Sequence, residues 1–355
     1  MFYKVYNRAI RLYILTKRLF KFVHYSKYLV AGKYCFSPEL KIFILHQKKE
    51  IDFCSNILNT KIKKTCLPLT FLLRILNFLF SNKKYGSILL FSNSTAKSLP
   101  VSYKFFNLDK NSVTTIYESH SKFRMDINAY NQFSMYFKVP QILVIDEKMM
   151  LLAEKLILPT SDSRCKHKTT TYKTIINTYI NYYKNSNRHS ILATPQMYLT
   201  EAKRKGMNDR WCKFFASKLK PYADTFVPIY FQHGDLSSYN IIIEDGTNEI
   251  YFIDYEHQGN YVFFYDVFWY MQNLARQDNV YNIVEDYIKG VFDKEFHDLF
   301  KAVNLEFCRS LKEIYYIIFV LEMYNNRLFT LSLNLAEKVI EELWDTYSLC
   351  KKMSH

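Results

Sequence analysis

The pattern of apolar and polar residues changes along the chain, and its middle part favours a sheet. Residues 84–158 begin with short β-rich runs, "YGSILLFS", "VSYKFF" and "SVTTIYES", which polar turns separate. "HSKFRMDINAYNQFSMY" then has helical spacing, and "KVPQILVID" and "KMMLLAEKLI" follow as two more apolar runs. We therefore predict the order β-β-β-α-β-β, a small sheet with one helix rather than a parallel βαβ array.

The chain after Pro159 has a mostly helical pattern. Two short β-like runs, at 241–243 and 250–253, interrupt it, and Asp245-Gly246 between them offers a hairpin turn. The aromatic residues of 263–270 recur at helical spacing and predict a helix core. Helices are predicted over four ranges, about 172–186, 197–220, 263–290 and 306–350.

The beginning of the chain is basic. Residues 2–30 contain no acid, Gly or Pro, and their apolar residues recur at helical spacing among Lys and Arg. This pattern is typical of an amphipathic helix on a membrane surface, and also of a helix packed on its own domain with a solvated basic face. Residues 34–80 are short mixed segments that Pro38 and Pro68 interrupt. We interpret 1–83 as a basic, partly helical extension.

Charge is distributed unevenly along the 355 residues. The net charge is +15, and the whole excess lies in residues 1–100, which hold 18 Lys or Arg and three acids. Such asymmetry indicates an anionic partner for that end, and because no nucleic-acid-binding motif is present we expect no nucleic acid. The seven Cys are scattered without metal-ligand spacing, as in a reducing cytosol. No signal peptide or membrane-spanning run is evident. We expect a cytoplasmic protein, with peripheral contact at the inner membrane face through 2–30 as the anchoring hypothesis.

Three oxygen-bearing side chains surround the predicted hairpin. Asp235 precedes its first strand, Asn240 begins that strand, and Asp254 ends the second strand. Because a hairpin returns to its start, we expect Asn240 and Asp254 to meet while Asp235 faces them. Carboxylate and amide oxygens suit magnesium, and phosphoryl transfer needs a carboxylate that orients the attacking hydroxyl. The pattern thus indicates a metal and a phosphate. We expect His233 to pack inward and brace the loop by hydrogen bonds.

"HGDLSSYN" (233–240) and "IDYE" (253–256) resemble the H-G-D-L-x-x-x-N and I-D-x-E motifs of the aminoglycoside phosphotransferase and choline kinase family, relatives of protein kinases. The resemblance covers about 84–355. It implies an α+β, two-lobed protein-kinase-like fold. Its small nucleotide-binding lobe, with an antiparallel sheet, would be 84–158, and its mainly helical catalytic and acceptor-binding lobe would be 159–355.

The resemblance also implies roles for individual residues, with ATP and Mg²⁺ as cofactors. Asp235 corresponds to the catalytic base, and Asn240 and Asp254 correspond to the magnesium ligands. Asp266, in "FFYDVFWY", corresponds to a structural Asp at a helix start that braces the catalytic loop. Glu256 corresponds either to a residue that touches substrate or metal or to a structural one. In "LLAEKLI" the hinge backbone facing adenine would run from Glu154 to Leu156.

The chain departs from the family in the small lobe. The family places a phosphate-binding Lys on the third strand and pairs it with a helix acid, whereas Thr115 occupies that position here. Lys104 on the preceding strand, or Lys122, are the candidates to replace it. Asp126 is the candidate partner, with Asn128 as the alternative register. A Gly-rich phosphate loop is also missing.

These observations predict an ATP- and Mg²⁺-dependent phosphotransferase that acts on a hydroxyl of a small molecule or sugar. The basic end favours an acceptor at an anionic surface, such as a lipid-linked surface glycan. The alternative is a catalytically impaired pseudokinase that acts as a glycan-binding or accessory protein. Retention of Asp235, Asn240 and Asp254 together favours the active enzyme.

Overall fold

The computed structural model describes residues 21, 24–25, 27–30, 32, 34–37, 42–58, 65–66, 84–92, 102–160, 163–186, 191–223, 225–255, 257–278, 280–328, 331 and 333–353. Most of the predicted 2–30 helix and Glu256 lie outside these residues. The chain forms two compact units. The first takes the described residues of 1–128, 139–163 and 244–251, and the second takes those of 129–138, 164–243 and 252–355.

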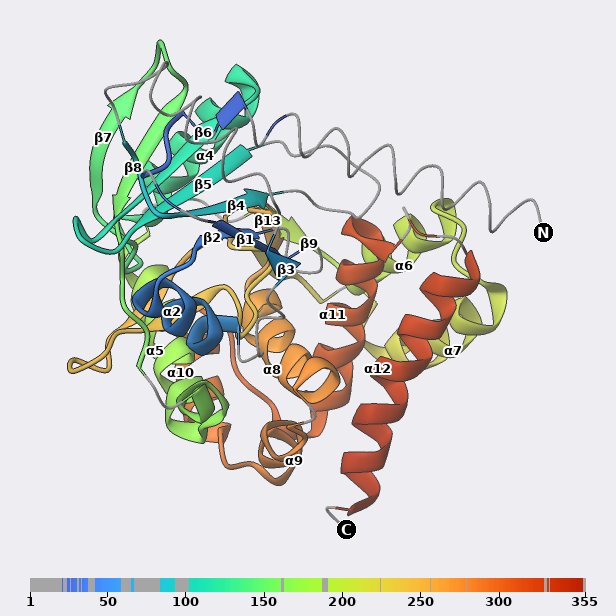
Figure 1. The fold of residues 1–355 in the computed structure, drawn as a ribbon. Coiled ribbons are helices and arrows are strands. Elements are labelled where there is room, and N and C mark those ends of the chain that lie inside the picture. Colours follow the sequence, from blue (N-terminus) through green and yellow to red (C-terminus); the bar gives the residue numbers. More distant parts are fainter. Residues whose placement is uncertain are drawn as a thin grey trace. The chain divides into compact units, whose positions relative to one another are not determined.

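The first unit is built on an eight-stranded sheet whose strand order is β3-β1-β2-β4-β5-β6-β8-β7 (Figure 1). Neighbouring strands pair antiparallel throughout. The strands are β1 (Tyr34–Ser37), β2 (Ile42–Leu45), β3 (Thr65–Cys66), β4 (Ile88–Ser92), β5 (Ser102–Asn107), β6 (Ser112–Tyr117), β7 (Ile142–Asp146) and β8 (Leu151–Lys155). Among the described residues, the helices α2 (Lys48–Leu58) and α4 (His120–Phe133, up to residue 128 in this unit) accompany them.

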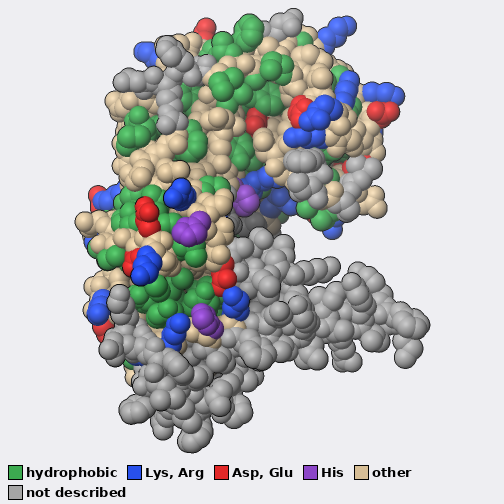
Figure 2. Space-filling view, turned by 90° about the horizontal axis from the view of Figure 1, so that it is seen from above, with side chains coloured by type: hydrophobic (Ala, Val, Ile, Leu, Met, Phe, Trp, Pro, Cys, Tyr) green, Lys and Arg blue, Asp and Glu red, His purple; other side chains and the backbone are tan. Residues whose placement is uncertain are grey.

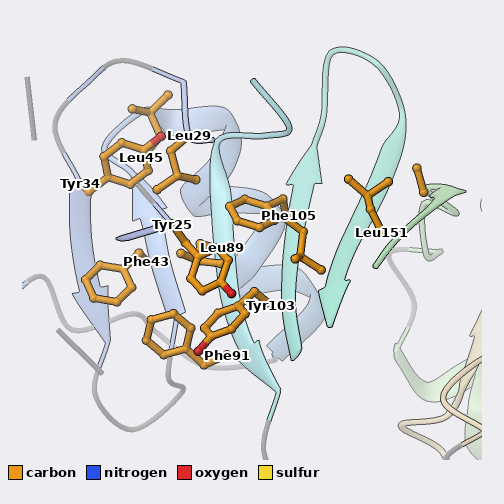
Figure 3. Packing of buried hydrophobic residues seen from close by; sticks show 12 residues of the cluster. Tyr25, Leu29, Tyr34, Phe43, Leu45, Leu89, Phe91, Tyr103, Phe105 and Leu151 are labelled. Atoms are coloured by element: carbon orange, nitrogen blue, oxygen red, sulfur yellow. The ribbon is translucent and has the colours of Figure 1, made fainter. Parts of the chain in front are cut away.

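The two faces of this sheet carry different clusters because side chains alternate along a strand. Tyr103 and Phe105 of β5 face the cluster in Figure 3, which also contains Leu89 and Phe91 of β4. Lys104, between them in sequence, faces the opposite side. On that opposite side one cluster includes Cys54 of α2, and another joins Phe123 of α4 to Tyr117 and Leu152.

The predicted order β-β-β-α-β-β over 84–158 is confirmed as β4-β5-β6-α4-β7-β8. The sheet also extends across the boundary that we placed between residues 83 and 84, since β2 pairs with β4 and β1 pairs with both β2 and β3. The short runs of 34–66 showed no clear period, because strands of two to four residues are too brief to display one.

The second unit is mainly helical and contains a three-stranded sheet in the order β13-β10-β9. A separate hairpin consists of β11 and β12, and its residues 244–251, the turn and the start of β12, belong to the first unit. The strands are β9 (Ile191–Ala193), β10 (Val227–Gln232), β11 (Ile241–Ile243), β12 (Ile250–Phe252) and β13 (Gly259–Val262). The helices are α5 (Thr169–Asn185), α6 (Pro195–Arg204), α7 (Asp209–Leu219), α8 (Tyr265–Gln277), α9 (Asn282–Lys289), α10 (Asp293–Ala302), α11 (Lys312–Asn326) and α12 (Leu333–Met353).

Three of the four predicted helical ranges contain breaks. Gly206 has φ +86° and ends α6 before Asn208 caps α7 by accepting a hydrogen bond from the Arg210 N–H. The range 263–290 is divided into α8 and α9, and Gly290, with φ +95°, ends α9 at the end of that range. The range 306–350 is divided into α11 and α12. α11 is buried along almost its whole length and α8 supplies many fully buried aromatic rings, so these helices form the core of the second unit.

The α+β class, with an antiparallel sheet followed by a largely helical region, is therefore confirmed. Within the described part of the chain, no helix combines the length and apolarity needed to cross a bilayer. On the face seen in Figure 2, acidic and basic side chains of the described residues are interspersed rather than separated. The basic residues 1–100 are only partly among those described.

Candidate active site

The loop 233–240 connects β10 to β11 in the second unit, and Gly234 fixes its turn. Gly234 has φ +76°, a conformation that residues with a Cβ rarely adopt. A Cβ at this position would lie 2.0 Å from the carbonyl oxygen of His257 and 2.8 Å from the ring of Tyr261. The loop therefore requires glycine for two independent reasons, conformation and space.

Asp266, in the first turn of α8, holds the start of this loop. Its carboxylate is fully buried and accepts hydrogen bonds from the backbone N–H of His233 (2.7 Å) and of Gly234 (2.9 Å). The Tyr179 hydroxyl of α5 donates to it at 2.5 Å. Burial raises the pKa of Asp266, and these hydrogen bonds oppose the rise only in part. These contacts fix the backbone at the start of the loop to α8 and α5.

His233 links the loop to the segment that follows β12. Its Nε2 lies 2.9 Å from the carbonyl oxygen of Ile253, and its Nδ1 accepts the Asp235 N–H at 3.3 Å. Both contacts are satisfied when Nε2 carries the proton. The ring is fully buried against Phe133 and Tyr255, with ring centroids 6.0 and 5.5 Å away. This side chain is thus positioned to orient the loop rather than to exchange protons with a ligand.

Asp235, Asn240 and Asp254 come together in the second unit as the hairpin predicts. Asn240 Nδ2 donates to the Asp235 carbonyl (2.7 Å) and to Asp235 Oδ2 (3.2 Å), which leaves the Asn240 amide oxygen for another partner. The Ile253 N–H donates to the Asn240 carbonyl at 3.0 Å, so Asp254 directly follows a residue bonded to Asn240. Asp254 is exposed and has φ +66°, an uncommon backbone conformation of the kind found at functional sites.

The sequence did not identify two further partners of Asp235. Arg327, the residue after α11, places Nη1 2.7 Å from Asp235 Oδ1, and its Nη2 donates to the Gly234 carbonyl. Trp269 Nε1 donates to the same Oδ1 at 3.1 Å. The aromatic run 263–270 is otherwise buried core as predicted, but Trp269 is only partly buried and reaches the site. Trp269 could have been predicted to reach the site because it lies one helical turn after Asp266. The residues around Arg327 in the sequence give no indication that it contacts Asp235.

The end of the loop has its own support. Lys166 donates to the Ser238 carbonyl at 2.7 Å, and the Ser238 hydroxyl donates to Asp278 Oδ2 at 2.8 Å. His167 Nε2 lies 3.2 Å from that same oxygen. Burial lowers the pKa of Lys166 to about 8, and Asp278 counteracts part of that decrease. Both ends of the loop are therefore held by buried or half-buried polar side chains.

The candidate nucleotide-binding residues lie in the first unit. Lys104 on β5 is the cross-strand partner of Thr115 on β6, so the two side chains share one face of the sheet. Thr115 is also the partner of Leu152, whose cluster includes α4, so this is the face that α4 covers. On α4, Asp126 forms an ion pair with Lys122 at 2.9 Å. Asp126, the candidate partner on the helix, is therefore paired with Lys122.

The predicted hinge backbone is engaged within the sheet. Glu154 is paired with both β6 and β7, the Lys155 N–H donates to the Gln141 carbonyl, and the Leu156 N–H donates to the Asn111 carbonyl, each of these two at 2.8 Å. The Leu156 N–H is thus already used. An adenine contact from Glu154–Leu156 stays a prediction, and this geometry speaks against the Leu156 N–H as its donor.

No family model and no curated protein matches the chain. Among solved structures it is similar to choline kinase LicA from Streptococcus pneumoniae, with 13% identity, a TM-score of 0.39, and 74% of this chain and 89% of that chain covered. For the GDP complex of aminoglycoside 2'-phosphotransferase-IIIa the values are 12%, 0.45, 75% and 93%. For a microcompartment-associated aminopropanol kinase they are 12%, 0.41, 74% and 91%.

Proposed function

We propose that the chain is a Mg²⁺- and ATP-dependent phosphotransferase whose acceptor is a hydroxyl of a small molecule or sugar. The observation that carries this proposal is the hydrogen bonding of Asn240 to Asp235 and of the Ile253 N–H to the Asn240 carbonyl, which brings Asp254, the next residue, beside them. Asp235 would orient the acceptor hydroxyl and accept its proton. Its backbone and carboxylate are fixed by His233, Asn240, Trp269 and Arg327, so its orientation requires no rearrangement at the moment of transfer.

The residues present fit a magnesium ion. Asn240 offers an amide oxygen and Asp254 an exposed carboxylate, which are hard ligands. Among the described residues no group of three or more His, Cys, Asp or Glu could hold a metal by itself. Magnesium bound to a nucleotide needs only one or two protein carboxylates, because phosphates and water complete its coordination. When bound, the ion would neutralise charge on the phosphates.

The first unit would hold the nucleotide. In the absence of a strand-three lysine, Lys104 is the proposed replacement, because it lies directly opposite Thr115 on the same face of the sheet. Cross-strand partners have Cβ atoms roughly 5 Å apart, a displacement that a lysine side chain can span. Asp126 already pairs with Lys122, so Lys122 is the competing candidate.

The proposal is tested by thermal unfolding with Mg-ATP, using the wild type and Asp254→Asn. Asparagine tolerates the same positive φ and has nearly the same shape, so this variant removes the charge and retains the backbone. A hundredfold excess of ligand over its Kd adds about 2.7 kcal/mol to stability, or roughly a few degrees in Tm for a protein of this size. We expect this rise in the wild type and its loss in Asp254→Asn.

Catalysis itself is tested by ADP release in the wild type and in Asp235→Asn. We expect the variant to keep the Mg-ATP thermal shift and to lose turnover by roughly a hundredfold or more. A wild type that binds Mg-ATP but shows the same turnover as Asp235→Asn would refute the enzyme and support the accessory-protein alternative. Absence of any Mg-ATP shift would refute the nucleotide site.

A further inference from the structure

The surroundings of Asp235 are unusual for a carboxylate that must meet a substrate, because a cation of the chain itself already occupies them. The Arg327 guanidinium pairs with Asp235 Oδ1 at 2.7 Å, and its central carbon lies 4.5 Å from the centroid of the Trp269 ring. The Trp269 indole N–H donates to the same Oδ1 at 3.1 Å. The two side chains of the ion pair are partly exposed, Arg327 at 19% and Asp235 at 28%, so a ligand can reach both.

A cationic acceptor would bind through the same two groups, the Asp235 carboxylate and the Trp269 ring. An amine or quaternary ammonium group is recognised by a carboxylate and by the face of an aromatic ring, with Trp the strongest of the aromatic residues. Here Arg327 makes both contacts, with Asp235 as the carboxylate and Trp269 as the ring. A second cation at this position would meet a fixed like charge at short range in a partly desolvated site, which is unfavourable.

An anionic group of an acceptor would instead be attracted by the Arg327 guanidinium. A guanidinium presents five donors in a planar fork that matches carboxylate and phosphate oxygens. Arg327 uses donors of its Nη1 and Nη2 groups for Asp235 and the Gly234 carbonyl. These two contacts fix the guanidinium in place, and a fixed donor loses little entropy when it binds.

We propose that Arg327 selects acceptors that carry an anionic group, a carboxylate or a phosphate, close to the hydroxyl that is phosphorylated. This inference rests on the proposed function, since it describes the acceptor of the same site. Arg327 would contact the acceptor and hold Asp235 beside the reacting hydroxyl. The acceptor class is then an acidic sugar or a sugar phosphate rather than an aminosugar or an amino alcohol.

The experiment compares sugars that differ mainly in charge. ADP release with Mg-ATP is measured for D-glucose, D-glucosamine, D-glucuronate and D-glucose 6-phosphate, and for the corresponding galactose series, with the wild type, Arg327→Gln and Arg327→Lys. The two anionic members distinguish carboxylate from phosphate. The decisive quantity is the ratio of kcat/KM between an anionic sugar and its neutral parent, because a merely structural role of Arg327 would lower both equally.

We expect the wild type to prefer an anionic member and to use the amine poorly. In Arg327→Gln the anionic-to-neutral ratio falls by roughly ten- to a hundredfold, since a charge-assisted hydrogen bond is lost. Arg327→Lys keeps the charge but loses the fork, so it retains an intermediate ratio. The Mg-ATP thermal shift of each variant checks that the site is still folded.

Preference of the wild type for the amine, or an unchanged ratio in Arg327→Gln, would overturn the inference. So would a failure of both anionic sugars to be phosphorylated or, by calorimetry with Mg-AMP-PNP present, to bind. Each of these results leaves the kinase proposal intact if Mg-ATP still binds and Asp235→Asn abolishes turnover of another acceptor. Loss of those two properties would instead refute the kinase itself.

Discussion

The two units differ in how firmly they hold the residues expected to take part in phosphoryl transfer. In the second unit the loop 233–240 is held from several directions, by Asp266 at its start, by Arg327 at Asp235 and by Asp278 at Ser238. In the first unit the strand position of the expected lysine carries Thr115.

The difference follows from what each side must do. The proposed base and metal ligands would act through short, directional contacts, so their backbone would have little freedom to vary. A lysine that holds phosphates acts as a point charge on a long flexible stem, so a neighbouring strand can supply it. We therefore expect the loop 233–240 of the second unit to tolerate few changes, and we expect Lys104 of the first unit to replace the lysine that is missing at Thr115.

The largest effect is expected at Gly234. Gly234→Ala places a Cβ against the His257 carbonyl and forces a positive φ on alanine, so we expect a loss on the order of 5 kcal/mol in the free energy of unfolding. Gly246→Ala is the matched control. Gly246 has φ +81° but no atom within 4 Å of the added Cβ, so only the conformational cost of about 1–2 kcal/mol remains. If urea denaturation gives both variants the same loss in the free energy of unfolding, the predicted clash between the added Cβ and the His257 carbonyl is wrong.

Removal of the Asp266 brace comes next. Asp266→Ala leaves two buried backbone N–H groups and the Tyr179 hydroxyl without their acceptor, and we expect a loss of roughly 3–5 kcal/mol. Tyr179→Phe removes one of those three contacts and should cost about 1 kcal/mol. If the two variants unfold at the same urea concentration, Asp266 is not the brace that its contacts indicate.

A third prediction concerns pH and α11, the helix that directly precedes Arg327. Burial raises the pKa of Glu322 on α11 from 4.5 to about 7, although Asn326 donates to it at 2.7 Å. Above pH 7 the folded state holds a disfavoured anion, and as the pH falls from about 7 toward 4.5 it takes up a proton before the unfolded chain does. The free energy of unfolding should therefore rise by about 2–3 kcal/mol over this range, and Glu322→Gln should abolish that part of the rise.

Glu313 on the same helix is the control of opposite sign. Although burial raises its pKa, the ion pairs with Lys218 and Lys351 lower it below the usual value, so its contribution is present at neutral pH and is lost as the pH falls through its folded pKa. Glu313→Gln should destabilise the protein at pH 8, where Glu322→Gln should stabilise it. Parallel pH profiles for the two variants would contradict the assignment for Glu322.

The smallest effect is expected in the first unit. Lys104→Ala should raise the KM for ATP about tenfold, equivalent to about 1.4 kcal/mol, because one charge near the phosphates is removed. Lys110→Ala, an exposed lysine near the β5–β6 turn, should change the KM by less than twofold. A larger effect of Lys122→Ala than of Lys104→Ala would move the phosphate contact to α4.

The sequence was most informative where the chemistry is local. Asp235, Asn240 and Asp254 lie within 20 residues, and a hairpin turn at Asp245-Gly246 was enough to predict that they meet. β9, β10 and β13, which hold the loop, were not predicted. β10 contains Pro228, which weakens a strand pattern, and β9 and β13 have only three and four residues. Arg327 lies 92 residues from Asp235, and no periodicity in one dimension relates the two.

The positive φ of Asp254 also limits how this protein can change over evolutionary time. Only Gly, Asn and Asp commonly adopt that conformation, and of these only Asp supplies an anionic oxygen. Under the proposed function, a descendant that no longer needed a metal ligand here could replace Asp254 by Asn or Gly with little loss of stability, whereas almost any other residue would strain the fold. If the proposed function holds, the identity of this one residue records whether a lineage has retained the proposed chemistry, independently of how far the rest of its sequence has diverged.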